Sequence, residues 1–177
     1  MLLKVVLGIL VVLAIFVAFI ASRDGHFKYE VSEHINAPIE KVFPYISDLK
    51  KGSEWSPFEK VDPNMKKDYQ GIPDQVGAKL VFAGNSDAGA GSVEITKIVP
   101  NEMVELRLIM TAPMAADNIV TYQVMKDGEG TKFTWSMSGE GGFAGKLVTF
   151  FVDCEKMITD QFKQGIANLK TIVEVTN

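Results

Sequence analysis

The sequence predicts an α+β protein in which an antiparallel β-sheet with one buried face packs against a long C-terminal helix, preceded by a single transmembrane helix. Three observations lead to this fold class. The first 22 residues are almost entirely apolar, residues 65–138 hold short alternating runs separated by turn residues, and the last 30 repeat apolar side chains at helical spacing. With 177 residues, 47% of them hydrophobic, the chain suits one anchored globular domain.

The N-terminal segment is long enough to cross a membrane. Nineteen of the first 22 residues are hydrophobic, and residues 5–21 carry no charge. As a helix, residues 2–22 would extend about 31 Å, which spans a hydrocarbon core of about 30 Å. A cleaved signal peptide is the alternative, but cleavage after Ala21 would place the bulky Phe19 where the peptidase needs a small residue. We therefore predict an uncleaved anchor at residues 1–22 and a separate domain at residues 23–177.

The charges that flank this segment decide its orientation only narrowly. Lys4 precedes the apolar run, whereas Arg23 and Lys28 follow it, so the positive-inside comparison is close to a tie. A short, positively charged N-terminal flank usually stays in the cytoplasm. We therefore expect a single-pass protein of the cell membrane whose domain lies on the outer side, periplasmic or extracellular.

The charge balance excludes one class of partner. The chain has 18 Lys and Arg against 22 Asp and Glu, for a net charge of −4. Nucleic-acid-binding proteins show a basic footprint, which this composition lacks. No nucleic-acid partner is expected.

The middle of the chain predicts one short helix and a series of strands. Residues 27–35 alternate apolar and polar side chains, which is typical of a half-buried strand. A helix is expected to start at Asn36, a good capping residue, and to be kept short by Pro44 and Gly52. Short connections between the later runs indicate an antiparallel sheet. Those runs are residues 79–83, 92–99, 103–111, 119–125 and 131–138.

The C-terminal segment has the periodicity of an amphipathic helix. Apolar residues recur every three or four positions from Leu147 to Val173, and both Phe151 and Cys154 belong to this stripe. One continuous helix of nearly 30 residues would be roughly 45 Å long. Its weak point is Gly165, since glycine is about 1 kcal/mol less favourable than alanine inside a helix.

Five segments carry a resemblance to a known family: Ile35–Phe43, Asp48-Leu49 with Glu54–Phe58, Phe82–Asn85, Gly91–Ile95 and Phe162–Lys170. They resemble the START/SRPBCC superfamily, and within it the bacterial polyketide cyclase/dehydrase and lipid-transport family, over residues 27–175. The resemblance implies the helix-grip fold, in which a curved antiparallel sheet wraps around the long C-terminal helix and leaves an apolar cavity between them. Members include lipid carriers, hormone receptors and aromatic-ring cyclases, so the resemblance is more specific for fold than for function.

Strand alternation predicts which side chains face this cavity. If Phe82 points inward, the same phase turns Tyr122 and Trp135 inward as possible hydrogen-bonding groups, and turns Glu105 and Arg107 outward. The alternative is that the inward residues only fill a core. Two candidates, Trp55 and Phe58, are expected in a loop, where they either close the cavity mouth or pack beneath it. The full set of candidate ligand-binding residues is Trp55, Phe58, Phe82, Leu106, Leu108, Tyr122, Trp135, Met137, Phe151 and Phe162.

The sequence yields no catalytic set. His34 lies on the polar face of its strand, and Cys154 falls on the apolar stripe, where a buried, inert thiol is expected. One cysteine and two separated histidines do not make a zinc site. Residues 139–144 match the G-x-G-x-x-[GA] pattern, but no second parallel strand follows, so a dinucleotide is not expected. We predict no catalytic residues, no metal and no cofactor.

Three hypotheses for function remain. The first, which we favour, is a membrane-tethered module that binds or transfers a hydrophobic small molecule or lipid. The second is a polyketide cyclase/dehydrase-like enzyme, with Tyr122 as the inward proton-transfer group and Asp48 or Glu54 as candidates from the loop. The third is a membrane-associated interaction or stress-response module without a ligand.

Overall fold

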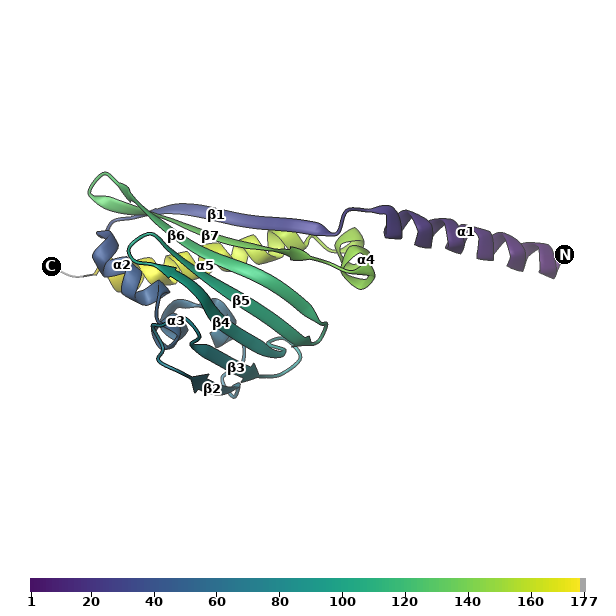
Figure 1. The fold of residues 1–177 in the computed structure, drawn as a ribbon. Coiled ribbons are helices and arrows are strands. Elements are labelled where there is room, and N and C mark those ends of the chain that lie inside the picture. The colour runs from purple at the N-terminus through teal and green to yellow at the C-terminus, as the bar shows by residue number, and fades with distance from the viewer. Residues whose placement is uncertain (176–177) are drawn as a thin grey trace.

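A computed structural model describes residues 1–175 and confirms the predicted fold class. The last two residues of the predicted domain, 176–177, lie outside the described residues. Within residues 1–175, one curved antiparallel sheet has the strand order β1-β7-β6-β5-β4-β3-β2 (Figure 1). The strands are β1 (His26–Ile35), β2 (Lys66–Gln70), β3 (Lys79–Ala83), β4 (Ala90–Val99), β5 (Met103–Ala112), β6 (Ala116–Asp127) and β7 (Gly130–Glu140).

The helices lie at both ends of the sheet and on its inner face. In Figure 1, the yellow C-terminal helix runs along the sheet, the two short helices α2 and α3 lie at one end, and the purple N-terminal helix projects from the other. The end of α5 therefore lies far from the start of α1 (Figure 1). The helices are α1 (Leu2–Ser22), α2 (Ile39–Ile46), α3 (Leu49–Trp55), the 3₁₀-helix η1 (Pro57–Lys60), α4 (Phe143–Phe151) and α5 (Cys154–Val173).

The prediction of one continuous C-terminal helix, made from the periodicity, is wrong. The chain breaks after α4, where Val152 adopts an extended conformation (φ −123°, ψ 132°). Asp153 then caps α5, because its carboxylate accepts a hydrogen bond from the backbone N–H of Lys156 at 2.9 Å. A strong N-cap in the middle of an apolar stripe thus divides the stripe into two helices, and α5 keeps 20 residues.

The residues expected to end the first short helix do not end it. Pro44 lies inside α2, and Gly52 lies inside α3. The break falls instead at Asp48, whose carboxylate accepts hydrogen bonds from the backbone N–H groups of Lys50 and Lys51 and so caps α3. As a result Trp55 and Phe58 lie in α3 and η1, not in the loop that was expected.

The predicted strand phase is confirmed on both faces. Leu106, Phe133 and Trp135 are buried in the hydrophobic core that the sheet shares with α5, while Arg107 points outward and pairs with Asp117. In β4 the register shifts after Ile95, so that one extra residue interrupts the ladder. Beyond this bulge the inward phase resumes, and the hydrophobic core stays continuous along the strand.

Gly165, although unfavourable inside a helix, has a packing role in α5. It is buried in the middle of α5, and a Cβ atom there would lie 2.6 Å from the Trp135 ring and 3.0 Å from the Pro57 ring. The glycine therefore allows α5 to approach the sheet and η1 closely. This contact compensates for the poor helix propensity of the residue.

Gly165→Ala is expected to lower the free energy of unfolding by up to about 2 kcal/mol, because overpacking typically costs 1–3 kcal/mol and the gain in helix propensity offsets only ~1 kcal/mol of it. Urea unfolding of the detergent-solubilised protein measures this change. The matched control is Gly52→Ala in α3, where the added Cβ meets open space. An equal or higher stability for Gly165→Ala than for the wild type would show that α5 does not need this close approach.

Candidate ligand-binding cavity

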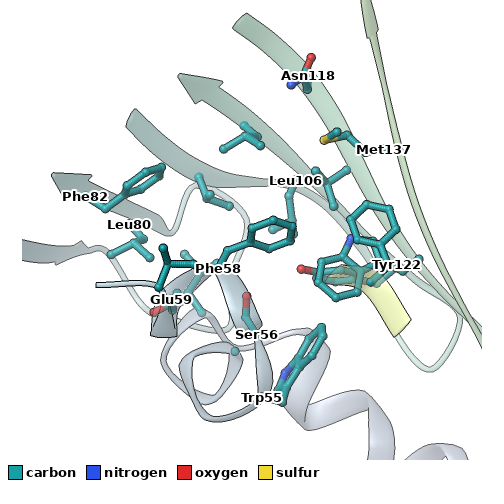
Figure 2. A pocket seen from close by; sticks show the side chains of 18 of the residues that line it. Trp55, Ser56, Phe58, Glu59, Leu80, Phe82, Leu106, Asn118, Tyr122 and Met137 are labelled. Atoms are coloured by element: carbon teal, nitrogen blue, oxygen red, sulfur yellow. The ribbon is translucent and has the colours of Figure 1, made fainter. Parts of the chain in front are cut away.

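A cavity of about 340 Å³ lies between the inner face of the sheet and the helices α3, η1 and α5. This volume is at the lower end of the range for small-molecule sites, roughly 300–1,000 Å³. Figure 2 shows side chains from the sheet and from the α3–η1 segment pointing toward the same space. Its wall is mostly apolar and includes Ile46, Leu49, Val61, Met65, Leu80, Val93, Met110, Val120 and Ile158.

Nine of the ten candidate ligand-binding residues line this cavity. Trp55 and Phe58 come from the helical segment, Phe162 comes from α5, and the remaining six come from β3, β5, β6 and β7. Those six are Phe82, Leu106, Leu108, Tyr122, Trp135 and Met137. The sheet, the α3–η1 segment and α5 thus bring side chains that are far apart in the sequence to one cavity.

Phe151 is the exception, and its predicted place in the cavity is wrong. It is the last residue of α4, is 72% exposed, and lies next to Phe16 of α1 with ring centroids 6.5 Å apart. The periodicity of one continuous helix would have carried it inward. Because the chain breaks before Asp153, α4 turns this side chain away from the sheet.

Aromatic rings form the inner wall of the cavity. Trp135 stacks on Phe162 at 4.3 Å between centroids and meets Trp55 edge to face at 5.2 Å. Trp55 is 1% exposed and donates its indole N–H to the Tyr45 carbonyl at 2.8 Å, so it serves as a fixed part of the core. Phe58, in contrast, is partly exposed, and its ring points into the cavity (Figure 2).

Two tryptophan N–H groups thus have different environments. The Trp55 donor is satisfied, whereas the Trp135 Nε1 atom is buried and has no acceptor within the described residues 1–175. A buried donor without a partner costs about 1–3 kcal/mol. The Trp135 ring is held in place by its aromatic neighbours despite this cost.

Tyr122 supplies a polar group to the apolar wall. Figure 2 shows its hydroxyl pointing into the space below Phe58. Burial raises the pKa of Tyr122 well above its usual value, and the nearby negative charge of Glu59 raises it further. The hydroxyl is therefore protonated at neutral pH, and it can donate or accept a hydrogen bond but cannot act as a base.

Asn118 is a polar lining residue that the sequence reasoning missed. It is the third residue of β6 and is 8% exposed, on the same face as Val120 and Tyr122. The predicted strand began at residue 119, three residues after the start of β6, and one further step of the alternation would have found Asn118. Gly139 on β7 makes room for its side chain, because a Cβ there would lie 2.2 Å from the amide oxygen.

Glu59 is the second missed residue. It lies in η1 and lines the cavity, and its carboxylate accepts hydrogen bonds from Lys67 at 2.9 Å and from the Tyr69 hydroxyl at 3.2 Å. No periodicity marks a residue in such a short helix. A single 3₁₀ turn leaves no sequence signal from which its direction could have been predicted.

The residues considered for catalysis have other surroundings. Asp48 borders the cavity, but its carboxylate caps α3, and Glu54 is exposed and not part of the wall.

Cys154 is half-buried at the first position of α5, so the expectation of a buried thiol is wrong. His34 is exposed, as expected, and bonds to Asp127 at 2.8 Å. Among residues 1–175 no three His, Cys, Asp or Glu side chains gather as metal ligands.

The raised pKa values of the two tyrosines near Glu59 predict that the folded protein loses stability at alkaline pH. Burial, followed by the charge of Glu59, raises the pKa of Tyr69 to about 12, and the pKa of Tyr122 is raised in the same direction. In the unfolded chain both ionise near 10. The folded state thus binds more protons above pH 10, and its stability falls as the pH rises from 10 towards 12.

Urea unfolding at several pH values checks this expectation. Stability should begin to fall near pH 10, and the fall should be less steep for Tyr69→Phe than for the wild type, because one raised pKa is gone. Identical slopes for the two proteins would mean that Tyr69 ionises at the same pH in the folded and unfolded states.

A curved antiparallel sheet closed over an apolar cavity by a C-terminal helix defines a helix-grip protein with an internal hydrophobic pocket. Residues 26–174 match the family described as Polyketide cyclase / dehydrase and lipid transport, and the chain belongs to this family. The match starts after α1 and so covers the sheet, the cavity and α5. A search of curated proteins found no significant match.

Solved structures with the same fold come from several bacteria. Protein CV1439 from Chromobacterium violaceum is 16% identical with a TM-score of 0.61, covering 84% of this chain and 98% of that one. Protein MLL2253 from Mesorhizobium loti is 16% identical with a TM-score of 0.63, covering 85% and 99%. DynU16, a protein of the dynemicin biosynthetic locus, is 15% identical with a TM-score of 0.59, covering 84% of this chain and 47% of that one. At these identities the likeness concerns the fold alone.

The N-terminal helix lies outside this shared fold. Within the described residues, α1 is the one helix whose length and hydropathy suffice to cross a membrane, and it is almost entirely exposed. A signal sequence would have the same length and composition. The helix therefore qualifies as a membrane anchor or a signal sequence.

Proposed function

We propose that this protein is a membrane-tethered module that binds or transfers a hydrophobic small molecule or lipid. The observation that carries the proposal is the 340 Å³ cavity with its mostly apolar wall. Such pockets, with a few convergent polar groups, suit hydrophobic ligands whose orientation is fixed by one or two hydrogen bonds. Family membership agrees with this role, since the family description includes lipid transport.

The polar groups of the cavity narrow the class of ligand. Tyr122 is protonated at neutral pH and Asn118 carries both a donor and an acceptor, so both offer hydrogen bonds to a neutral polar group. The carboxylate of Glu59 adds negative charge to the wall. A ligand with a large apolar body and a carbonyl or hydroxyl group fits these features better than a pure hydrocarbon.

The proposed tether places the cavity near a source of such ligands. Met110, Asn118 and Met137 lie at the end of the sheet where β1 begins, directly after α1. This end of the cavity wall therefore faces the side from which α1 projects (Figure 1). We keep the outer side of the cell membrane, expected from Lys4, as the location of the domain, and an inactive C-terminal alkaline phosphatase fusion would place it in the cytoplasm instead.

Displacement of a dansylated fatty acid from the full-length protein in detergent tests the proposal. Anthrone and anthracene are ligands of similar size, and anthrone alone carries a carbonyl acceptor. Anthrone should displace the probe from the wild type better than anthracene does. Tyr122→Phe should reduce this preference for anthrone about three- to tenfold, since one hydrogen bond is worth about 0.5–1.5 kcal/mol. Tyr29→Phe, outside the cavity wall, is the matched control. A protein that binds none of these probes would contradict the proposed function.

A cyclase- or dehydrase-like enzyme is the second candidate. It is favoured by one arrangement, the Glu59 carboxylate and the Tyr122 hydroxyl on the wall of the same cavity. An apolar cavity can fold a reactive chain, and the two groups would then accept and donate protons. Conversion of a poly-β-ketone substrate by the wild type, abolished in both Glu59→Gln and Tyr122→Phe, would decide for the enzyme.

A further inference from the structure

The helix α4 presents an exposed apolar surface outside the cavity. Phe143, Phe150 and Phe151 of the helix and Val152 after it are all exposed, and Met157 extends the surface onto α5. We call these five residues the α4 patch. Helices that expose aromatic side chains in this way are typical of surfaces that meet another apolar phase.

The α4 patch is continuous with α1. The ring of Phe150 meets Phe16 edge to face at 5.6 Å and Phe19 at 6.2 Å between centroids. The Lys146 ammonium donates a hydrogen bond to the carbonyl of Ala21 at 3.1 Å. These contacts hold α4 against the C-terminal end of α1.

The backbone reinforces this arrangement. The N–H of Gly141, just before α4, donates to the carbonyl of Gly25 at 2.8 Å, so the segments that lead into α4 and out of α1 are bonded to each other. Ile20, near the end of α1, is fully buried. The angle between α1 and the rest of the protein is therefore set by packing and not by a free linker.

Contact with α1 determines the depth of α4 in a bilayer that α1 crosses. Phe16 lies six residues before Ser22, the end of α1, which corresponds to about 9 Å along the helix axis. Interfacial helices bury their apolar face about 5–10 Å into the boundary between headgroups and acyl chains. A ring that touches Phe16 and Phe19 therefore lies at this depth.

The charged side chains around α4 also suit a position at the membrane–water interface. Arg23 lies over the Phe150 ring, with its guanidinium carbon 5.7 Å from the ring centre, and Lys146 reaches the end of α1. Aromatic rings beside cationic side chains are characteristic of the membrane–water interface. Both cations also lie close enough to the boundary to meet anionic lipid headgroups.

We propose that α4 is a second, interfacial membrane contact, with Phe150, Phe151 and Val152 inserted at the headgroup–acyl boundary of the bilayer that α1 crosses. This inference rests on the proposed membrane tether. With two contacts the protein has a fixed orientation on the membrane, and the Asn118–Met137 end of the cavity is held toward the lipid surface. The occupant of the α4 patch is the lipid bilayer, not a second protein.

Collision accessibility of nitroxide labels tests the inference on the full chain in vesicles of phosphatidylcholine and phosphatidylglycerol. The lone Cys154 is first replaced by serine, and single cysteines are introduced by Phe151→Cys or Val152→Cys. Leu10→Cys in the middle of α1 provides the lipid reference. Glu129→Cys, in the β6–β7 turn at the far end of the sheet from α1 in Figure 1, provides the aqueous reference.

Labels at 151 and 152 should collide several-fold more with oxygen, relative to a nickel chelate, than the label at 129. The Val152→Cys protein keeps both phenylalanines, so it covers the case in which Phe151→Cys weakens the contact. Water-exposed labels at 151 and 152, with a lipid-embedded label at 10, would overturn the inference and leave the tether intact. Labels shielded from both reagents would overturn it in favour of a protein contact. A water-exposed label at 10 would refute the tether itself.

Discussion

Tryptophan at both Val93 and Leu108 is expected to abolish probe binding while the protein remains folded. The two residues form a cross-strand pair on β4 and β5, and both side chains line the cavity. Aromatic pairs are well tolerated at facing positions of a sheet, and here the added rings can grow into the cavity and not into packed core. We expect the affinity for a dansylated fatty acid to fall by ~100-fold or more, which corresponds to about 2.8 kcal/mol.

The control for this variant is Val81→Trp on the outer face of β3. Val81 is exposed and does not line the cavity. The Val81→Trp substitution adds a tryptophan to the same sheet but outside the cavity, so the affinity for the probe should stay at the wild-type value. If the double tryptophan variant bound the probe as tightly as the wild type, the probe would occupy a site other than this cavity.

Two lysines in the middle of α1 are expected to remove the protein from the membrane. Each lysine at the centre of a spanning helix costs about 2.5–3.5 kcal/mol on the insertion scale, so Leu10→Lys with Leu13→Lys costs roughly 5–7 kcal/mol. Fractionation of cells, followed by an alkaline carbonate wash of the membranes, measures the effect. The double variant should move from the carbonate-resistant membrane fraction to the washed or soluble fraction.

Leu2→Lys with Leu3→Lys is the matched control, because lysines at a helix end can extend their ammonium groups to the interface. This control should stay in the carbonate-resistant fraction. A double variant at positions 10 and 13 that also stayed there would show that α1 does not span the bilayer. Release of the double variant only by carbonate, and not by buffer, would agree with residual binding through α4.

Most of the fold could be predicted because it follows from repeating patterns. Alternation in the strands and the position of the turns give an antiparallel sheet with a defined inner face, and the apolar stripe gives a C-terminal helix that covers it. The helix boundaries could not be predicted in the same way. They depend on single carboxylates, Asp48 and Asp153, whose capping hydrogen bonds outweigh the periodicity on either side.

The candidate site was predictable to the extent that it lies on regular elements. Tyr122, Trp135 and Phe162 were placed by period alone, and each lines the cavity. Glu59 was not, because η1 is too short to have a period, and Phe151 was misplaced because the helix ends there and the chain changes direction at the next residue, Val152. Contacts between α1 and α4 join segments more than 120 residues apart, and no local pattern indicates them.

The most direct test of the central claim is native mass spectrometry of the full-length protein extracted in mild detergent, followed by solvent extraction and identification of any bound small molecule. The Val93→Trp, Leu108→Trp protein, purified in parallel, accounts for lipid that adheres to α1 or α4. We predict a reproducible hydrophobic molecule, with a carbonyl or hydroxyl group, that is bound to the wild type and missing from the variant. The same molecules on both proteins, or none on the wild type together with no binding of the dansylated fatty acid, would contradict a ligand-binding cavity.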